Sequence, residues 1–334
     1  MNYKNCLLRI AALFFFSFCL LNTAYAKGKF VPSKGKILYF AGQNVDSIKD
    51  YVQTVGIIPA GLMTYTSVQN ADSLDQPMDN GAGINHAQYL LDKYPDTALQ
   101  IGLYMVDALD GIIAGDFDDN IDFIGSFIKH SSRPVFLRIG YEFDGPHNHY
   151  NPAKYVKAYR RIVDRFRKNG VNNVAYVWHS YASKLSRPLE DWYPGDEYVD
   201  WFGISFFDQK DEKMFMPMLR LARLHHKPVM VAEASPARTS TSLGEACWNG
   251  WFKRYFDFIN KNNIKCFCYI NINWDNFPLF KELNWGDARL GTNEFIRQKW
   301  VEEIRKDKYL MSSGQLFNQI GFTPSESSPP KSEK

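Results

Sequence analysis

The chain has 334 residues, of which 45% are apolar and 22% are charged, a composition typical of a globular protein with a sizeable core. Its formal net charge of +3 falls to +1, with 37 basic against 36 acidic residues, once a leader that carries Lys4 and Arg9 is removed. A nearly neutral chain lacks the electrostatic footprint of a protein that binds nucleic acid or an anionic membrane, so we expect neither partner and favour a neutral ligand.

The first 26 residues have the three parts of a secretory signal peptide. A basic region is followed by the apolar run Ile10–Leu21 and by the small residues Ala24 and Ala26 at positions −3 and −1. The run has 12 residues, whereas a membrane-spanning helix needs about 20. Phe18 before Cys19 is too bulky for a lipobox. We therefore expect cleavage after residue 26 and export to the periplasm or the extracellular space, without a membrane anchor.

Beyond the leader, short apolar runs alternate with longer amphipathic stretches. Most apolar runs are continuous rather than alternating, as expected for strands that are buried on both faces. We predict strands at Lys36–Ala41, Ile57–Tyr65, Ala98–Met105, Pro134–Tyr141, Asn173–Trp178, Trp201–Phe206, Lys227–Ala232 and Ile264–Ile272. Helices are predicted at Asn85–Lys93, Asp118–His130, Pro152–Asn169, Lys213–His226, Glu245–Asn262 and Thr292–Tyr309.

Eight strands, each followed by a helical or loop segment over about 280 residues, predict a (β/α)₈ barrel, the TIM-barrel fold of the α/β class. No domain boundary or internal repeat is visible, so one catalytic domain is expected over residues 27–322. Residues 323–334 are rich in Ser, Pro and charge and predict a disordered tail. In such barrels the chemistry takes place at the C-terminal ends of the strands.

Two glutamates stand at the ends of predicted strands four and seven. Glu142 follows the apolar run PVFLRI, and Glu233 ends the run KPVMVAE. Burial raises a carboxyl pKa and a nearby Arg lowers it, so two carboxylates in different surroundings can act as an acid and a nucleophile at one pH. Retaining cleavage of a glycoside needs such a pair, about 5 to 5.5 Å apart. Either glutamate alone could be an ordinary strand-end residue, but the two together predict a catalytic pair.

Other strand ends place an aromatic side chain beside a polar one. Sugars stack their CH-rich faces on aromatic rings and need polar partners for their hydroxyl groups. One aromatic at such a place usually belongs to the core, but three strand ends with the same pairing predict sugar subsites. From strands five, six and eight the candidates are Trp178, His179, Tyr181, Phe206, Asp208, Asn271 and Trp274. Around Glu142 they are Arg138, Tyr141 and Asp144.

These motifs give the chain a resemblance to the clan A glycoside hydrolases, and most of all to glycoside hydrolase family 26, which includes β-mannanases, β-1,3-xylanases and lichenase-type glucanases. The likeness is strongest over residues 138–178, which begin with the pattern Arg-x-x-x-Glu-x-x-Gly, and a weaker likeness covers nearly all of the chain after the leader. The resemblance implies a (β/α)₈ fold with Glu142 as acid/base and Glu233 as nucleophile. It also implies that Trp274 is the aromatic platform under the sugar at subsite −1.

Tyr141 and Asp144 depart from the family pattern, which has His directly before the acid/base and Asn two residues after it. The substrate is therefore not carried over, and β-mannan, β-1,3-xylan, β-glucan and the producer's own exopolysaccharide all stay open. We predict a monomeric, retaining and endo-acting β-glycoside hydrolase that cleaves a polysaccharide or oligosaccharide by double displacement, without a cofactor. The departures leave a second hypothesis, a non-catalytic barrel that binds glycans.

Two polar clusters could bind a metal ion. His147 and His149 could form a metal pair, but we favour a polar loop over the cleft. An acidic stretch after predicted strand three could hold Ca²⁺ or substrate hydroxyl groups, but its spacing is not that of an EF-hand, and part of it suits a helix N-terminus. Its residues are Asp107, Asp110, Asp116, Asp118 and Asp119. We therefore predict no metal site.

Three cysteines follow the leader, so at most one internal disulfide can form. Cys266 and Cys268 lie two residues apart in a predicted strand, which points their side chains the same way and prevents them from pairing with each other. Cys247 could pair with either of them. The interpretation that we favour is three buried free thiols.

Overall fold

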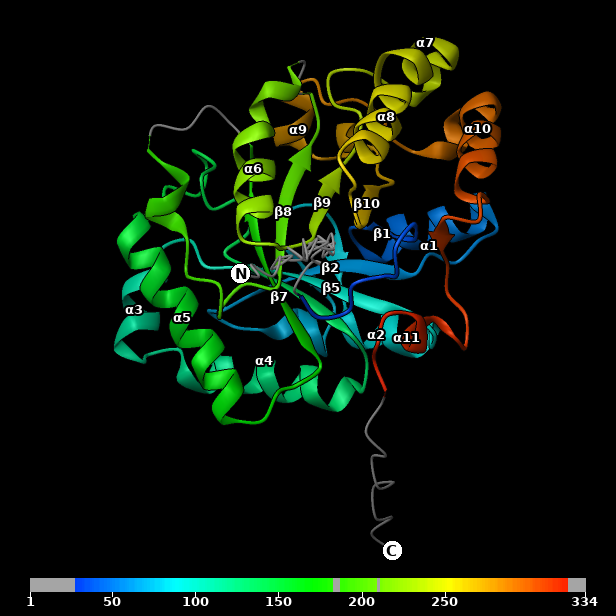
Figure 1. Cartoon of the computed structure of the whole chain (residues 1–334). Helices are drawn as coiled ribbons and strands as arrows, with labels where there is room; N and C mark the ends of the chain where they lie inside the picture. The colour runs from blue at the N-terminus through cyan, green and yellow to red at the C-terminus, as the bar shows by residue number, and fades with distance from the viewer. Residues whose placement is uncertain (1–27, 183–186, 209–210, 324–334) are drawn as a thin grey trace, which may run out of the picture.

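The computed structural model describes residues 28–182, 187–208 and 211–323 (Figure 1). The predicted signal peptide lies outside these residues, as does the predicted tail apart from Thr323. Within the described ranges, no helix combines the length and the apolar composition that a membrane span requires.

Within these residues, eight parallel strands close into a barrel (Figure 1). In chain order they are β1 (Ile37–Gly42), β2 (Gly61–Ser67), β5 (Ala98–Tyr104), β6 (Val135–Ile139), β7 (Val174–Ser180), β8 (Trp201–Phe206), β9 (Val229–Ala234) and β10 (Cys266–Ile270). Each strand pairs in parallel with the next, and the ring closes where Leu38 of β1 lies opposite Cys266 of β10. The predicted (β/α)₈ barrel is confirmed.

Helices cover the outside of the barrel (Figure 1). The α-helices are α1 (Val45–Val55), α2 (Ala87–Lys93), α3 (Leu109–Ala114), α4 (Asp118–Ser131), α5 (Pro152–Lys168), α6 (Met216–Leu224), α7 (Glu245–Cys247), α8 (Lys253–Lys261), α9 (Pro278–Glu282), α10 (Glu294–Ile304) and α11 (Leu316–Gln319). Short strands are β3 (Met78–Asp79), β4 (Ile84–Asn85) and β11 (Tyr309–Leu310). In the described part of the connection after β7, the structure has a short 3₁₀ helix, η2 (Leu189–Trp192).

Several predicted boundaries are wrong. The second barrel strand begins at Gly61 rather than Ile57, because Pro59 has no N–H to donate to a strand ladder. The structure adds α1, whose signals are a capping box between Asn44 and Ser47 and a left-handed Gly56 at its end. The single helix predicted over 245–262 is interrupted by a π-helical turn, η5 (Trp248–Phe252).

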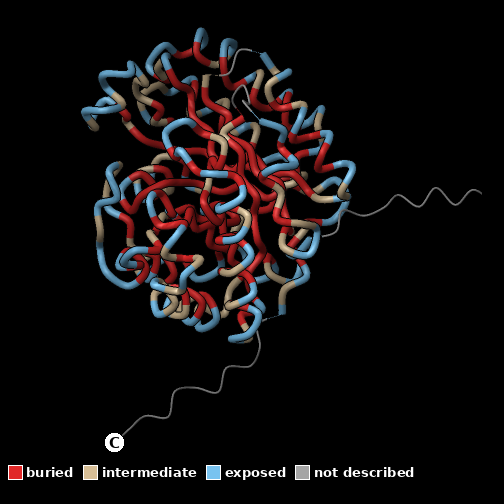
Figure 2. The backbone as a smooth tube through the Cα atoms, turned by 90° about the vertical axis from the view of Figure 1, so that its left-hand side faces the viewer, coloured by how far each residue is buried: buried red, intermediate tan, exposed pale blue. Residues whose placement is uncertain are grey.

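The buried side chains form two main layers. Figure 2 shows the buried residues as red tube, with the exposed residues toward the outside. Leu38 and Phe40 of β1 face one layer, and Tyr39 between them faces the other. Phe40 contacts Phe136 of β6, a strand three places along the ring, at a ring-centroid distance of 5.3 Å, so this layer fills the barrel interior. The second layer lies between strands and helices. Both faces of each strand are therefore buried, which explains the continuous apolar runs.

The three cysteines are buried and free. Cys266 and Cys268 both face the barrel interior, and Cys247 lies in the outer layer. The interpretation of three free thiols is confirmed, and a disulfide from Cys247 to either neighbour is excluded in this structure.

Candidate active site

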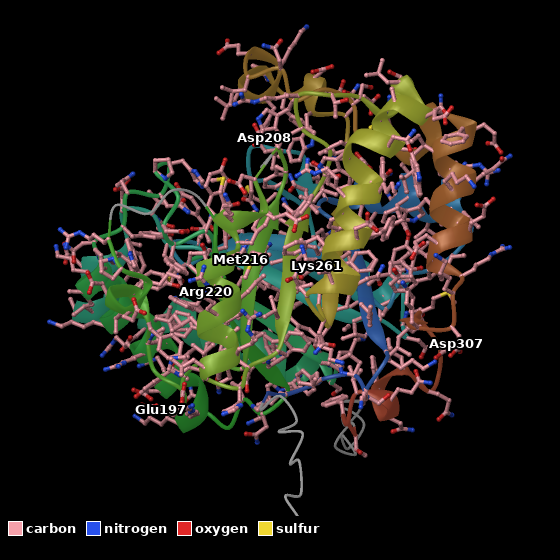
Figure 3. The ribbon with its side chains drawn as sticks, turned by 45° about the horizontal axis from the view of Figure 1, so that its top comes forward. Glu197, Asp208, Met216, Arg220, Lys261 and Asp307 are labelled. Atoms are coloured by element: carbon pink, nitrogen blue, oxygen red, sulfur yellow. The ribbon has the colours of Figure 1, made fainter. Side chains whose placement is uncertain are left out.

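The two glutamates lie at the C-terminal end of the barrel. Glu233 belongs to the last part of β9, the seventh barrel strand, and Glu142 lies three residues after β6, the fourth, in a left-handed conformation with φ 52°. Ser205 of β8 lies opposite Glu233 in the sheet register and donates a 2.5 Å hydrogen bond to Oε1 of Glu142. Both carboxylates therefore flank one serine. Figure 3 shows Asp208, just after β8, at the end of the barrel opposite Glu197, which precedes that strand.

Glu233 is surrounded by fixed donors. Nη1 of Arg138 donates to Oε1 of Glu233 in a buried ion pair, and the hydroxyl of Tyr65 donates to the same oxygen at 2.7 Å. The guanidinium lies over the rings of Tyr65 and Tyr141, at 4.9 and 5.2 Å from their centroids. Burial alone would lower the pKa of Arg138, but the charge of Glu233, together with Tyr65 and the hydrogen bonds to both, outweighs burial and raises that pKa. Two donors therefore fix one oxygen of this carboxylate, and one of them is charged.

Glu142 lies in different surroundings. Burial, and then the negative charge of Glu233, raise the pKa of the Glu142 carboxyl, while hydrogen bonds from His147 and Ser205 oppose the rise. Nε2 of His147 lies 2.8 Å from Oε2 of Glu142, and the His147 side chain is 48% exposed against 8% for Glu142. Glu142 therefore keeps its proton to a higher pH than an ordinary glutamate does, and its nearest titrating partner reaches solvent.

A buried chain of hydrogen bonds joins the two carboxylates. Nη1 of Arg138 lies 3.3 Å from Nδ1 of His179, and Nε2 of His179 lies 3.0 Å from Oγ of Ser205. A guanidinium can only donate, so Nδ1 accepts and the ring proton must sit on Nε2, which donates to Ser205. Burial and the charge of Arg138 lower the pKa of His179 well below its usual value, so the imidazole is neutral. Ser205 is thus left to donate its own hydrogen to Glu142.

Five predicted substrate-binding residues lie at or beside this pair. Arg138, Tyr141 and His179 belong to the surroundings just described. Asp144 accepts hydrogen bonds from the hydroxyl of Ser180 at 2.7 Å and from the backbone N–H of Tyr181 at 2.6 Å, and burial raises its pKa. The ring of Tyr181 meets the ring of His147 edge-on at 5.3 Å. Asp144 therefore fixes the strand end that carries Tyr181.

Three residues predicted to contact the sugar are buried in this structure. Trp178, Phe206 and Asn271 are at most 1% exposed. The ring of Trp178 stacks on Phe143 at 4.5 Å, and Phe206 also faces the helices, because alternate residues of a strand point to opposite faces. Nδ2 of Asn271 donates to Asp50 at 2.7 Å. In this structure these side chains therefore contribute to packing between the strands and the outer helices, and their predicted contacts with sugar stay a prediction.

Trp274 does not form an open platform in this structure. It is 2% exposed, and its Nε1 donates to Oγ of Ser235 at 2.9 Å. The rings of Phe280 and Trp285 cover it, at centroid distances of 4.5 and 4.8 Å. The chain around α9 folds back over this tryptophan, so no ring face is open to a sugar. The platform role that the resemblance implies for Trp274 stays a prediction, and it requires Phe280 and Trp285 to uncover the ring.

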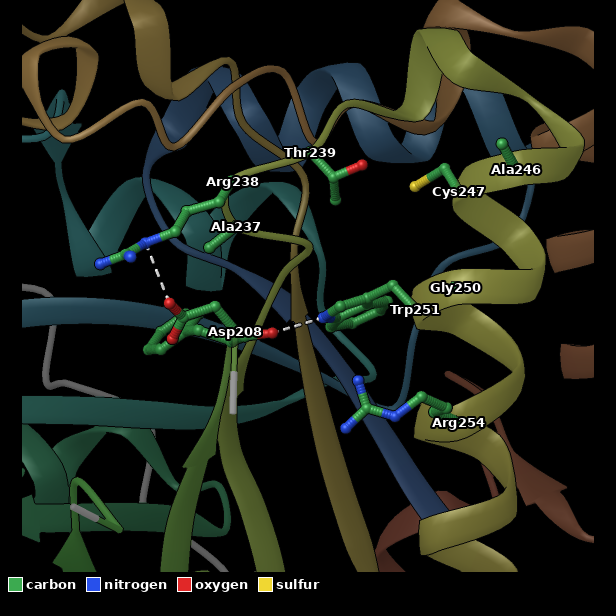
Figure 4. Close-up of a pocket in the computed structure, with 10 residues that line it drawn as sticks. Asp208, Ala237, Arg238, Thr239, Ala246, Cys247, Gly250, Trp251 and Arg254 are labelled. Atoms are coloured by element: carbon green, nitrogen blue, oxygen red, sulfur yellow. Dashed lines mark hydrogen bonds and ion pairs between the residues drawn. The ribbon is translucent and has the colours of Figure 1, made fainter. Parts of the chain in front are cut away.

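Asp208 lines a separate cavity of about 260 Å³ between the ends of β8 and β9 and helix α8 (Figure 4). Its carboxylate pairs with Nε of Arg238 at 3.0 Å, and Trp251 and Arg254 of the helical side close the cavity. Neither Glu142 nor Glu233 lines it. Asp208 is therefore placed near the catalytic end of the barrel but not against the two carboxylates.

Sequence reasoning missed three residues that contact the pair: Tyr65, Ser205 and His147. Tyr65 is the last residue of a predicted strand, and Ser205 is a polar residue inside an apolar strand. Each position is a weak sequence signal of a residue that contacts the site. The sequence places His147 in a polar loop after the fourth barrel strand, but no sequence signal indicates its contact with Glu142.

No set of three or more His, Cys, Asp or Glu side chains in the described part of the chain is arranged to hold a metal ion. His149 instead pairs with Asp107 at 3.0 Å, and Lys154 pairs with Asp110 at 2.6 Å. Asp118 is engaged by arginines of α5. These acidic side chains are therefore paired with other side chains of the protein.

Comparison with known proteins fits this geometry. The model of Glycosyl hydrolase family 26 matches residues 119–280, a range that holds both glutamates. A β-1,3-xylanase from a Vibrio species is 34% identical over 92% of this chain and 73% of its own length. A β-1,3-xylanase from an Alcaligenes species is 32% identical over 91% of this chain and 71% of its own length.

Solved structures share the fold. A family 26 β-mannanase from Bacteroides ovatus superposes with a TM-score of 0.60 at 16% identity, covering 84% of this chain and 91% of that one. The catalytic domain of a family 26 endo-β-1,4-mannanase from a Bacillus species gives 0.59 at 17% identity, covering 85% and 90%. The chain belongs to glycoside hydrolase family 26 and is a glycoside hydrolase.

Proposed function

We propose that the protein is a retaining, endo-acting β-glycanase in which Glu233 is the nucleophile and Glu142 the acid/base. The observation that carries this proposal is the contrast between two carboxylates that flank Ser205. Glu233 is held by the cation of Arg138 and by the hydroxyl of Tyr65. The pKa of Glu142 is raised by burial and by the charge of Glu233. Such a difference assigns a nucleophile and an acid at one pH.

The proposed reaction has two steps. In the first, an oxygen of Glu233 attacks the anomeric carbon while Glu142 gives its proton to the departing glycosidic oxygen, which keeps the bonding electron pair. In the second, Glu142 takes a proton from water, and the resulting hydroxide displaces Glu233 from the anomeric carbon. Two inversions leave the product with the configuration of the substrate. Once Glu233 is esterified its charge is gone, so one cause of the raised pKa of Glu142 is absent when this residue must act as a base.

We propose β-1,3-xylan as the substrate. The two relatives that match over nine tenths of this chain carry the name β-1,3-xylanase. A mannan endo-1,4-β-mannosidase from Thermothelomyces thermophilus matches only 46% of the chain, at 29% identity. A neutral polymer also suits the nearly neutral charge of the chain without its leader.

A panel of polymers tests the reaction and the substrate together. Purified protein is incubated with β-1,3-xylan, mannan, laminarin and lichenan, and the products are followed by mass and by NMR of the first anomer formed. We expect β-anomeric oligosaccharides of mixed length from β-1,3-xylan. Release of the α-anomer first would contradict retention, release of single sugars only would contradict endo action, and binding without any product would favour the non-catalytic barrel.

Two variants test the residues. Glu233→Ala should lose all detectable cleavage. In Glu142→Ala the rate of polymer cleavage should fall by about 10²- to 10⁴-fold. Azide should partly restore the activity of this variant on an activated aryl glycoside. Glu197→Gln, at the opposite end of the barrel, is the matched control and should behave as the wild type does. Full activity of either active-site variant would overturn the assignment.

We further propose that residues 1–26 direct export and that the mature protein is a monomer. N-terminal sequencing of protein recovered outside the cytoplasm should begin at Lys27. Light scattering should give the mass of one chain. An intact leader would overturn the proposed export signal, and the mass of a dimer would overturn the proposed monomer.

A further inference from the structure

His147 is held against the proposed acid/base by its own loop. Its Nε2 lies 2.8 Å from Oε2 of Glu142. Nδ2 of Asn148 donates to the carbonyl oxygens of Tyr141 at 2.8 Å and of Glu142 at 3.0 Å, which ties the loop back onto the glutamate. A Cβ atom on Gly145 would come within 2.5 Å of Cε1 of His147, so only glycine leaves room for the ring in this position. The placement of His147 is therefore built into the loop.

The hydrogen bonds around Glu142 locate its proton. Ser205 accepts from the imidazole of His179 and donates its own hydrogen to Oε1 of Glu142. With Oε1 occupied by a donor, the carboxyl proton is carried on Oε2. That oxygen is the one that faces His147. The transferable proton of Glu142 thus lies between Oε2 and Nε2 of His147.

We infer that His147 is a positioning residue for the acid/base, which shares the transferable proton of Glu142 across the contact between Nε2 and Oε2. This inference rests on the proposed role of Glu142. The proton that the pair shares is the one that Glu142 passes to the leaving oxygen in the first step and recovers from water in the second, so His147 adds no further reactant. Because His147 is half-exposed and Glu142 is buried, the histidine also connects this proton to solvent.

The charged groups around His147 all raise the pKa of its imidazole. The hydrogen bond to Glu142 raises the pKa of His147, burial opposes the rise, and the charges of Glu142, Glu233 and Asp144 raise it further. The ring of Tyr181 contacts it edge-on, and the neutral His179 adds no charge. A proton that two coupled bases share is lost at a higher pH than it would be from either base alone. The pair therefore extends the pH range over which the acid carries its proton.

The test is the pH profile of kcat/KM for His147→Gln on β-1,3-xylan, or on whichever polymer of the panel the wild type cleaves. The glutamine amide can donate to Oε2 but can neither take up a proton nor carry charge, so it stabilises the ionised glutamate. We expect the alkaline limb to move down by about one pH unit, with about tenfold lower activity above it, and the acid limb to stay in place.

His149→Gln is the matched control, since His149 lies on the same loop but pairs with Asp107 instead. It should reproduce the wild-type profile. An alkaline limb in His147→Gln equal to that of the wild type, or an equal shift in His149→Gln, would overturn the inference.

A second substrate separates proton sharing from a structural role. An aryl glycoside with an acidic phenol as leaving group needs little protonation, so His147→Gln should cleave it at nearly the wild-type rate. An equal loss on both substrates would overturn the inference in favour of a structural role. Failure of the inference is distinguishable from failure of the proposed function: in the first case Glu142→Ala still loses activity and responds to azide, and in the second it does not.

Discussion

The two glutamates of the site stand in contrasting parts of the molecule. Glu233 is part of strand β9, and its oxygen receives donors from β2 and β6, which are themselves barrel strands. Glu142 lies on a loop after β6, in a left-handed conformation, and one of its partners is half-exposed. A nucleophile needs one fixed position and one charge, whereas an acid/base must change its protonation twice in each cycle. The barrel strands therefore hold Glu233 rigidly, whereas the loop after β6 gives Glu142 access to protons from solvent.

The largest effect is expected from removing the cation beside Glu233. Arg138→Met leaves the carboxylate buried without its charged partner, which should lower the free energy of unfolding by about 3–5 kcal/mol. Cleavage should fall by about 10³-fold. Denaturant unfolding and steady-state kinetics measure the two effects. Arg297→Met, in an exposed pair with Glu294, is the control and should leave both unchanged.

A smaller effect is expected from Tyr65→Phe. This variant keeps the ring under Arg138 but removes the hydroxyl that donates to Glu233 at 2.7 Å. A hydrogen bond to a charged group contributes about 1.5–3 kcal/mol, so kcat/KM should fall by about 10- to 100-fold with the fold intact. Wild-type kinetics in this variant would show that Arg138 alone is sufficient to hold Glu233.

On the Glu142 side the expected effect is a shift in pH dependence. Ser205→Ala removes the donor at Oε1, which opposes the raised pKa of this carboxyl. Without it the pKa of Glu142 rises further, the acid stays protonated to a higher pH, and the alkaline limb of kcat/KM moves up. The direction is opposite to that expected for His147→Gln. Shifts of the same sign in the two variants would contradict the assignment of donors around Glu142.

The smallest catalytic effect is expected at Trp178. Because its ring stacks on Phe143 in the outer layer, Trp178→Phe should lower the free energy of unfolding by about 1–3 kcal/mol and leave KM unchanged. Thermal unfolding and KM on the same preparation are the measurements. A raised KM with unchanged stability would return Trp178 to the sugar-binding set.

The sequence alone was sufficient for the barrel and for the position of the two glutamates at the ends of its strands, because continuous apolar runs mark parallel strands. It was not sufficient for the direction of individual side chains. In a strand buried on both faces, Ser205 and Phe206 are neighbours in an apolar run, and no alternation says which of them faces the barrel interior. Phe206 was therefore chosen and Ser205 missed.

Contacts between distant residues were also beyond the sequence. Tyr65 and Glu233 are 168 residues apart, yet they share a hydrogen bond. Trp274 was expected to be open because of its place after strand eight, but Phe280 and Trp285, which follow it closely in the chain, cover its ring. Such contacts depend on how loops fold back over the strand ends, which no local pattern encodes.

The most direct test of the account is to trap the covalent intermediate. A 2-deoxy-2-fluoro xylobioside with a good leaving group should inactivate the enzyme, because the fluorine slows the second step more than the first. The mass of the protein should rise by that of one fluoroxylobiosyl group. Peptide mapping should place the adduct on Glu233. An adduct on any other residue, or turnover of β-1,3-xylan by a protein that this reagent never labels, would contradict the assignment of Glu233 as nucleophile.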